Sequence, residues 1–129
     1  MALSWDVMRS VILTLDGAVA DRALPIVRET ARRHGASVVL VQVGEATTEL
    51  HALVAALREE GIAAELETHA GSPASAADIV AEVARRRGGG LIVVATGRPP
   101  QVDESPAVGL TRLLLRAAPC PVVAVPAAA

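Results

Sequence analysis

The sequence contains no lysine, because all 12 of its basic side chains are arginine. A phosphate-binding loop of the Walker type and Schiff-base chemistry both require a lysine, so both are excluded. The patterns G-x-S-x-G, C-x-x-C and H-E-x-x-H are also missing. The three histidines show no spacing that is typical of metal ligands. We therefore predict no catalytic residues and no metal ligands.

Aromatic residues are nearly absent, because the chain has one tryptophan, Trp5, and no phenylalanine or tyrosine. The bases of single-stranded nucleic acids stack on aromatic side chains, and their phosphates bind positively charged surfaces. The net charge of −2 supplies no such attraction. Nucleic acid is therefore not an expected partner. We expect Trp5 to pack onto an end of the domain, or else to contact a partner protein.

Cysteine is also scarce, since Cys120 is the only one and cannot form an internal disulfide. A chain of this kind suits a reducing compartment. No apolar run approaches the roughly 20 residues of a membrane span, and residues 1–10 lack the features of a signal peptide. We therefore expect a cytoplasmic protein without membrane contact, folded as a single domain over residues 1–129.

The rest of the sequence alternates apolar runs of strand length with stretches of helical periodicity, a pattern typical of α/β domains. Strands are predicted at residues 10–15, 37–43, 63–67, 91–95 and 120–126. Four helices are predicted. The first ends at Gly35, and the second extends from Thr47 or Thr48 to Gly61. The third begins at Ser72 and Pro73, and the fourth includes Leu113, Leu114 and Leu115. The weak, alternating third strand is typical of a sheet edge. The arginines at 85–87 are expected to form a solvated helix end that complements the helix dipole.

These elements predict an open, five-stranded, mainly parallel sheet of order 3-2-1-4-5, with helices on both faces. In such sheets, ligands bind outside the carboxyl ends of the strands, at the point where the strand order reverses. That point lies between the first and fourth strands. The candidate binding residues there are Asp16, Gly17, Thr96 and Gly97.

Four segments, LDG, GSPASAADIVAEVA, LIVVATG and GLTRLLLRAAPCPVVAVP, resemble the universal stress protein (UspA-like) family over nearly the whole chain. The resemblance implies an adenine nucleotide alpha hydrolase-like fold and homodimers. In many members it also implies an ATP site, built from an aspartate after the first strand and a G-x-x-G-x9-G-[S/T] loop after the fourth. By position, Asp16 matches the aspartate and Gly97 matches the first glycine.

The rest of the loop departs from this pattern. Pro100 stands where the second glycine belongs, and the next step of the motif leads to Leu110 and Thr111. Counting back from the final strand instead places Val108 and Gly109 at the closing pair, with a shorter loop. Neither alignment restores the motif.

The missing glycines matter because they let a loop adopt positive φ and bring backbone N–H groups close to phosphate oxygens. Pro99 and Pro100 have no N–H to donate and hold φ at about −65°. Asp103 and Glu104 add negative charge, which Arg98 offsets in part. We interpret the loop as a degenerate, vestigial site at which ATP or AMP binds weakly or not at all, so that no cofactor is expected.

Each candidate residue also has a simpler structural interpretation. Asp16 is expected to accept N–H groups in the strand-to-helix turn, which we favour over contact with adenosine. Gly97 is expected to serve as a turn glycine, and Thr111 as a cap at a helix start rather than as a phosphate donor. Cys120 is expected to be a small buried hydrophobic residue rather than a nucleophile.

Two functions remain. We favour a non-enzymatic universal stress protein-like module that acts through dimerisation and protein contacts in the stress response. The alternative is a nucleotide-responsive member that binds ATP or AMP near Asp16 and Gly97, with at most slow hydrolysis. An apolar edge strand favours pairing across a twofold axis, so a homodimer is expected. Its contact residues are expected to be Val122, Val123, Ala124 and Val125.

Overall fold

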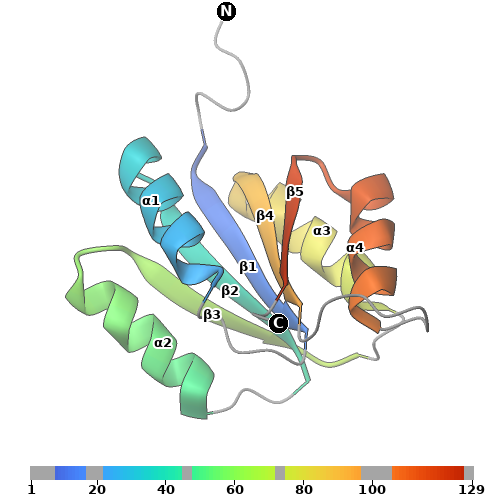
Figure 1. Cartoon of the computed structure of the whole chain (residues 1–129), viewed down its shortest axis with the longest axis horizontal. Helices are drawn as coiled ribbons and strands as arrows, with labels where there is room; N and C mark the ends of the chain where they lie inside the picture. Colours follow the sequence, from blue (N-terminus) through green and yellow to red (C-terminus); the bar gives the residue numbers. More distant parts are fainter. Residues whose placement is uncertain (1–7, 17–21, 45–47, 72–74, 97–105, 127–129) are drawn as a thin grey trace, which may run out of the picture.

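The computed structural model describes residues 8–16, 22–44, 48–71, 75–96 and 106–126, with the backbone alone at positions 16, 96 and 106–108. Within these ranges, parallel strands form one sheet of order β3-β2-β1-β4-β5 (Figure 1). The strands are β1 (Ser10–Asp16), β2 (Ser37–Val43), β3 (Ala64–His69), β4 (Gly89–Thr96) and β5 (Val122–Pro126). The helices are α1 (Leu24–His34), α2 (Thr48–Glu59), α3 (Ala76–Arg87) and α4 (Pro106–Ala117). The predicted sheet and its strand order are confirmed.

The helices cover both faces of the sheet and create two hydrophobic layers. Successive side chains of a strand point to opposite faces, so Val11 and Leu13 pack with α1 and α2, whereas Ile12 packs with α3 and α4. All three side chains are fully buried. Figure 1 shows α1 and α2 on one side of the sheet, with α3 and α4 on the other.

Glycines follow the ends of α1 and α3, and the one after α1 is where the sequence predicts it. Gly35 follows α1 with a φ of 62°, and Gly88 follows α3 with a φ of 66°. This left-handed backbone is readily adopted only by glycine, and the arginines before it suit the negative end of the helix dipole. Pro25 lies in the first turn of α1, where its missing N–H breaks no helical hydrogen bond. None of the described helices is long and apolar enough to cross a membrane.

Two local predictions are corrected. The edge strand β3 extends to His69, two residues beyond its predicted end at residue 67. The α3 helix is described from Ala76, and its predicted start at Ser72 and Pro73 lies outside the described residues. Cys120 precedes β5 instead of forming part of it, since β5 pairs with β4 from Val122 onward.

Candidate functional site

The carboxyl ends of β1 and β4 meet at the point where the strand order reverses. Asp16 is paired in register with Thr96, and Thr96 is paired in turn with Pro126 at the end of β5. The sheet therefore brings together two of the predicted site residues that are 80 positions apart in sequence. Gly17 and Gly97, which follow them, lie outside the described residues.

The other two predicted site residues lie in a helix rather than in a loop. Gly109 belongs to the first turn of α4, and Thr111 follows in the next turn, so Thr111 is not the helix cap that was expected. The Thr111 hydroxyl oxygen is buried and has no hydrogen-bond partner among the described residues. A buried hydroxyl is not positioned to donate to a phosphate in solvent.

The backbone of Gly109 does not have the conformation that a phosphate-binding nest requires. Such nests use residues with positive φ so that successive N–H groups converge on an anion. The described glycines with positive φ are Gly35, Gly44, Gly61 and Gly88. They end helices or follow β2, and Gly109 is not among them. Gly109 therefore does not provide a positive-φ position for such a nest.

The clearest electrostatic feature of the described residues is a network centred on Glu67. Glu67 lies on the face of β3 toward α3, and its side chain is 14% exposed. Arg86 and Arg87 donate to its carboxylate at 2.8 and 2.6 Å, and His69 Nε2 lies 3.0 Å from Oε1. Burial acts to raise the pKa of this carboxyl, but the hydrogen bonds from Arg86, Arg87 and His69 outweigh it and lower the pKa to about 2.

The arginines at 85–87 form the last turn of α3, as predicted, and this network adds ion pairs to that solvated helix end. Arg87 also pairs with Glu65 at 2.7 Å, and its pKa is raised by its hydrogen bonds to Glu67 and Glu65. Arg85 donates to the carbonyl of Ala117 at 3.1 Å, at the end of α4. The alternation of Glu65, Glu67 and His69 is the sequence feature that indicates the network, because charges on a helix-covered strand face require partners from that helix.

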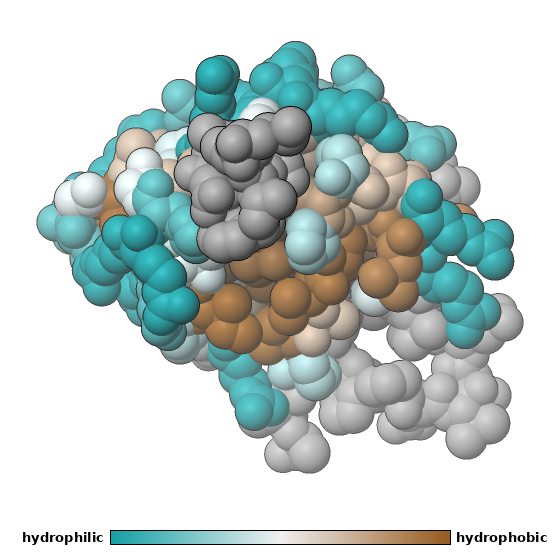
Figure 2. Space-filling view, turned by 90° about the horizontal axis from the view of Figure 1, so that it is seen from above, coloured by the Kyte–Doolittle hydropathy of each residue, from teal (hydrophilic) through white to brown (hydrophobic). Residues whose placement is uncertain are grey.

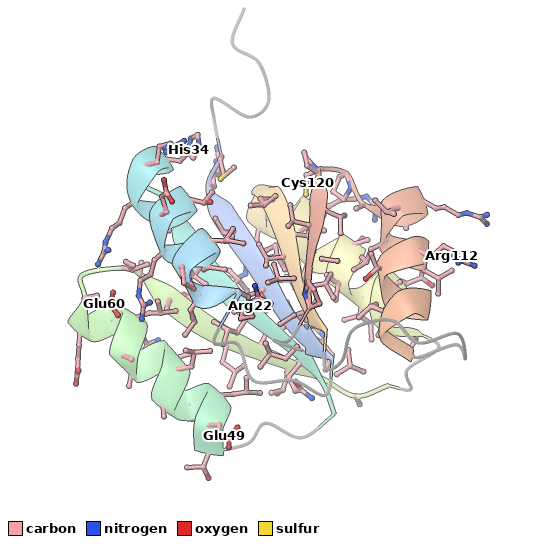
Figure 3. All side chains as sticks on the ribbon, in the orientation of Figure 1. Arg22, His34, Glu49, Glu60, Arg112 and Cys120 are labelled. Atoms are coloured by element: carbon pink, nitrogen blue, oxygen red, sulfur yellow. The ribbon has the colours of Figure 1, made fainter. Side chains whose placement is uncertain are left out.

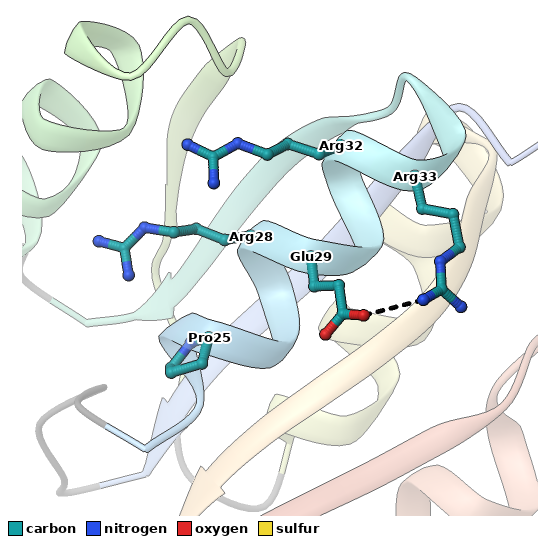
Figure 4. A pocket seen from close by; sticks show the side chains of 5 residues that line it. All are labelled: Pro25, Arg28, Glu29, Arg32 and Arg33. Carbon is teal, nitrogen blue, oxygen red and sulfur yellow. Dashed lines mark hydrogen bonds and ion pairs between the residues drawn. The ribbon is translucent and has the colours of Figure 1, made fainter.

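A shallow pocket on the outer side of α1 is not an anion site. Its lining residues are Pro25, Arg28, Glu29, Arg32 and Arg33 (Figure 4). Arg28 and Arg32 bind Glu60 Oε1 at 2.7 and 3.0 Å, and Arg33 binds Glu29 at 2.8 Å. The hydrogen bond from Arg28 lowers the pKa of Glu60. Each of these arginines already has a carboxylate partner, and the pocket lies along α1 rather than at the ends of the strands. We therefore assign its side chains to stabilising the fold and not to binding an anion.

Cys120 is not activated as a nucleophile. Its side chain is partly buried against the α3 and α4 layer, and this burial raises the pKa of the thiol. His34 lies at the end of α1, well separated from Cys120 beside β5 (Figure 3). Among the described residues, no group of three or more histidine, cysteine, aspartate or glutamate side chains could hold a metal ion. The expected role of Cys120 as a small hydrophobic residue agrees with this environment.

In sequence comparisons, no family model and no curated protein matches the chain. Solved structures match it over most of its length. The structure of a universal stress protein from Archaeoglobus fulgidus has a TM-score of 0.70 at 19% identity, covering 92% of this chain and 98% of that one. The universal stress protein from the same organism in complex with dAMP has a TM-score of 0.65 at 20% identity, with the same coverage.

A universal stress protein in complex with cAMP has a TM-score of 0.66 at 15% identity, covering 94% of this chain and 98% of that one. Identities this low establish the fold and leave ligand and activity open. The sequence resemblance and the structural likeness agree over nearly the whole chain. The chain therefore has the α/β fold of the universal stress proteins.

Proposed function

We propose that this chain is a universal stress protein-like module that acts without catalysis, through dimerisation and protein contacts in the cytoplasm, with a degenerate nucleotide site. One observation carries the proposal. The fold brings Asp16 and Thr96 together as a nucleotide site of this kind requires, but it places Gly109 and Thr111 in α4. With Pro99 and Pro100 in the intervening sequence, the phosphate-binding half of the site is degenerate.

The absence of catalysis is inferred from the residue types available. Acyl or phosphoryl transfer needs a nucleophile or a positioned water, a base and donors for the developing charge. The sequence has no lysine, and none of the hydrolase motifs is present. Cys120, the one thiol, has a raised pKa. These features favour a protein that recognises partners over one that converts a substrate.

The alternative is a nucleotide-responsive protein, and a specific observation favours it as the second candidate. Two structures of similar fold are complexes with dAMP and with cAMP, each of which carries a single phosphate. A monophosphate needs fewer N–H donors than a triphosphate. If a nucleotide binds here, AMP is therefore the better candidate, with the adenosine near Asp16.

Calorimetric titration separates the two functions. We expect ATP with Mg²⁺ to bind with a Kd of about millimolar or weaker, roughly −4 kcal/mol, because the loop lacks glycine N–H donors. ADP and AMP should be titrated in parallel under the same conditions. Micromolar affinity for any of the three would reject the proposal and establish the nucleotide-responsive alternative.

Replacing Asp16 with alanine provides a second test. We expect Asp16→Ala to lower the free energy of unfolding by about 0.5–2 kcal/mol, through lost hydrogen bonds in the turn after β1. The affinity for AMP should change little. Urea denaturation and calorimetry on the same preparation measure both effects. A large loss of AMP affinity at unchanged stability would show that Asp16 serves a ligand instead.

A further inference from the structure

The α4 helix exposes large apolar side chains to solvent. Leu113 is 45% exposed and Leu115 is 65% exposed, whereas Leu114 between them is fully buried. Successive residues of a helix lie about 100° apart around its axis, so the two exposed leucines flank the buried one on either side. Among the described residues, the only other exposed large hydrophobic side chain is Val123 on β5. The leucines make α4 a candidate contact surface.

Two arginines of α4 project into solvent between these leucines. Arg112 and Arg116 are exposed and lie one turn apart. Each is two residues from the buried Leu114, about 200° around the helix, so both point away from the core. Figure 3 shows Arg112 pointing away from the sheet. On the side of the molecule where α4 lies in Figure 1, Figure 2 shows hydrophilic side chains projecting beside hydrophobic surface.

Neither Arg112 nor Arg116 has a carboxylate partner among the described residues. On α1, by contrast, the exposed Arg33 pairs with Glu29 one turn away at 2.8 Å. The α4 helix, PAVGLTRLLLRA, contains no acidic residue that could do the same. The helix dipole favours a cation in the last turn, such as Arg116, but not in the middle of the helix, where Arg112 lies. The two positive charges are therefore available to a partner.

Gly109 lies on the same side of α4, three residues before Arg112 and four before Leu113. Glycine is less favourable than alanine in a helix. The fold does not require glycine here, because its φ is not positive and an added Cβ would meet nothing within 4 Å. The missing side chain lets a second backbone approach α4 closely. The exposed residues Gly109, Arg112, Leu113, Leu115 and Arg116 together form the α4 outer face.

We propose, building on the protein contacts of the proposed function, that the α4 outer face binds an acidic amphipathic helix of another protein. Carboxylates of that helix pair with Arg112 and Arg116, and its apolar side chains cover Leu113 and Leu115. A second copy of this chain does not fit. Two α4 helices would oppose arginine to arginine, and no other described helix exposes a large apolar side chain.

NMR titration of the ¹⁵N-labelled chain with a synthetic helical peptide, in which leucines and glutamates recur one turn apart, tests the proposal. We expect saturable shifts in the signals of the α4 outer face, and none with a peptide that carries lysine in place of glutamate. Arg112→Glu should weaken binding of the acidic peptide by about tenfold or more. Arg33→Glu is the matched control, because it changes the net charge equally but lies on α1, and it should leave the affinity unchanged.

Gly109→Ala separates recognition from folding. Alanine favours the helix, so the urea midpoint should rise, while the affinity for the acidic peptide should fall several-fold because the added methyl group obstructs the approach of a second backbone. No shifts at millimolar acidic peptide, shifts outside α4, or equal losses in Arg112→Glu and Arg33→Glu would overturn the proposal. So would binding to anionic phospholipid vesicles but not to the peptide, which would assign the face to a membrane. These outcomes leave the nucleotide titration unaffected, so the proposed function stands or falls separately.

Discussion

We expect Val123→Lys to convert a homodimer into a monomer. The β5 strand is at the edge of the sheet, with Val123 and Ala124 exposed. Unpaired N–H and C=O groups on an apolar edge can pair with a second copy across a twofold axis. Lysine at position 123 would place two positive charges beside each other at the centre of such an interface. Sedimentation velocity at tens of micromolar protein should give dimer for the parent and monomer for the variant.

The opposite edge of the sheet provides the matched control. The β3 strand carries Glu65 and Glu67, and charged side chains oppose pairing between edges. Thr68 is exposed on β3, so Thr68→Lys introduces the same side chain on an edge that should not pair. We expect Thr68→Lys to remain dimeric. A parent that is monomeric at tens of micromolar, or a Val123→Lys variant that stays dimeric, would exclude β5 as the interface.

The second large effect concerns stability in acid. The pKa of Glu67 is lowered from 4.5 to about 2 in the folded protein. A lowered pKa means that the folded state holds the ionised carboxylate more strongly than the unfolded state does. The stabilisation is therefore complete above pH 4.5 and is lost as the pH falls through about 2. Partial solvent exposure screens these ion pairs, and we expect a contribution of about 1–3 kcal/mol at neutral pH.

Replacing Glu67 with glutamine measures this contribution. We expect Glu67→Gln to lower the free energy of unfolding at pH 7 by about 1–3 kcal/mol, because Arg86 loses its carboxylate partner and Arg87 loses one of its two. The difference from the parent should shrink steadily from pH 4.5 toward pH 2, since the parent carboxylate is then protonated as well. Urea denaturation followed by far-UV circular dichroism at several pH values gives the comparison.

Glu82→Gln is the matched control for Glu67. Glu82 is 68% exposed and pairs with Arg85 across one helical turn at 3.4 Å, so the variant should change stability by less than about 0.5 kcal/mol. An equal loss in both variants would show that a general change in net charge, rather than the network, stabilises the fold. A Glu67→Gln variant as stable as the parent at pH 7, or one whose deficit stays the same down to pH 2, would reject the assigned ion pairs.

The sequence predicts the fold well because the relevant signals are local. The hydrophobic periods of β1 and α1 repeat over a few residues, and the arginine and glycine at a helix end act within one turn. Gly35 and Gly61, which the sequence places at helix ends, have a backbone with positive φ, as Gly88 does after α3. The alternation of strand and helix then leaves few topologies for a parallel sheet, so the order of the five strands follows as well.

The sequence likewise predicted one part of the candidate site and missed another part. The sequence alone indicated that Asp16 and Thr96 lie at the point where the strand order reverses, because parallel strands end at one edge of the sheet. It did not place Gly109 and Thr111 inside α4, although Ser105 followed by Pro106, where α4 begins, is the same kind of helix start as Ser72 followed by Pro73.

Only the tertiary structure decided which charges pair and which apolar residues stay exposed. Glu67 meets Arg87 across 20 positions in sequence because the chain crosses from β3 over α3, and no local pattern encodes that distance. Val123 and Val93 are both apolar strand residues, yet one is 37% exposed and the other fully buried. Burial depends on the neighbours that a fold supplies. Sequence periodicity therefore determined the elements and their order, while packing decided the network at Glu67 and the exposure of Val123 on β5.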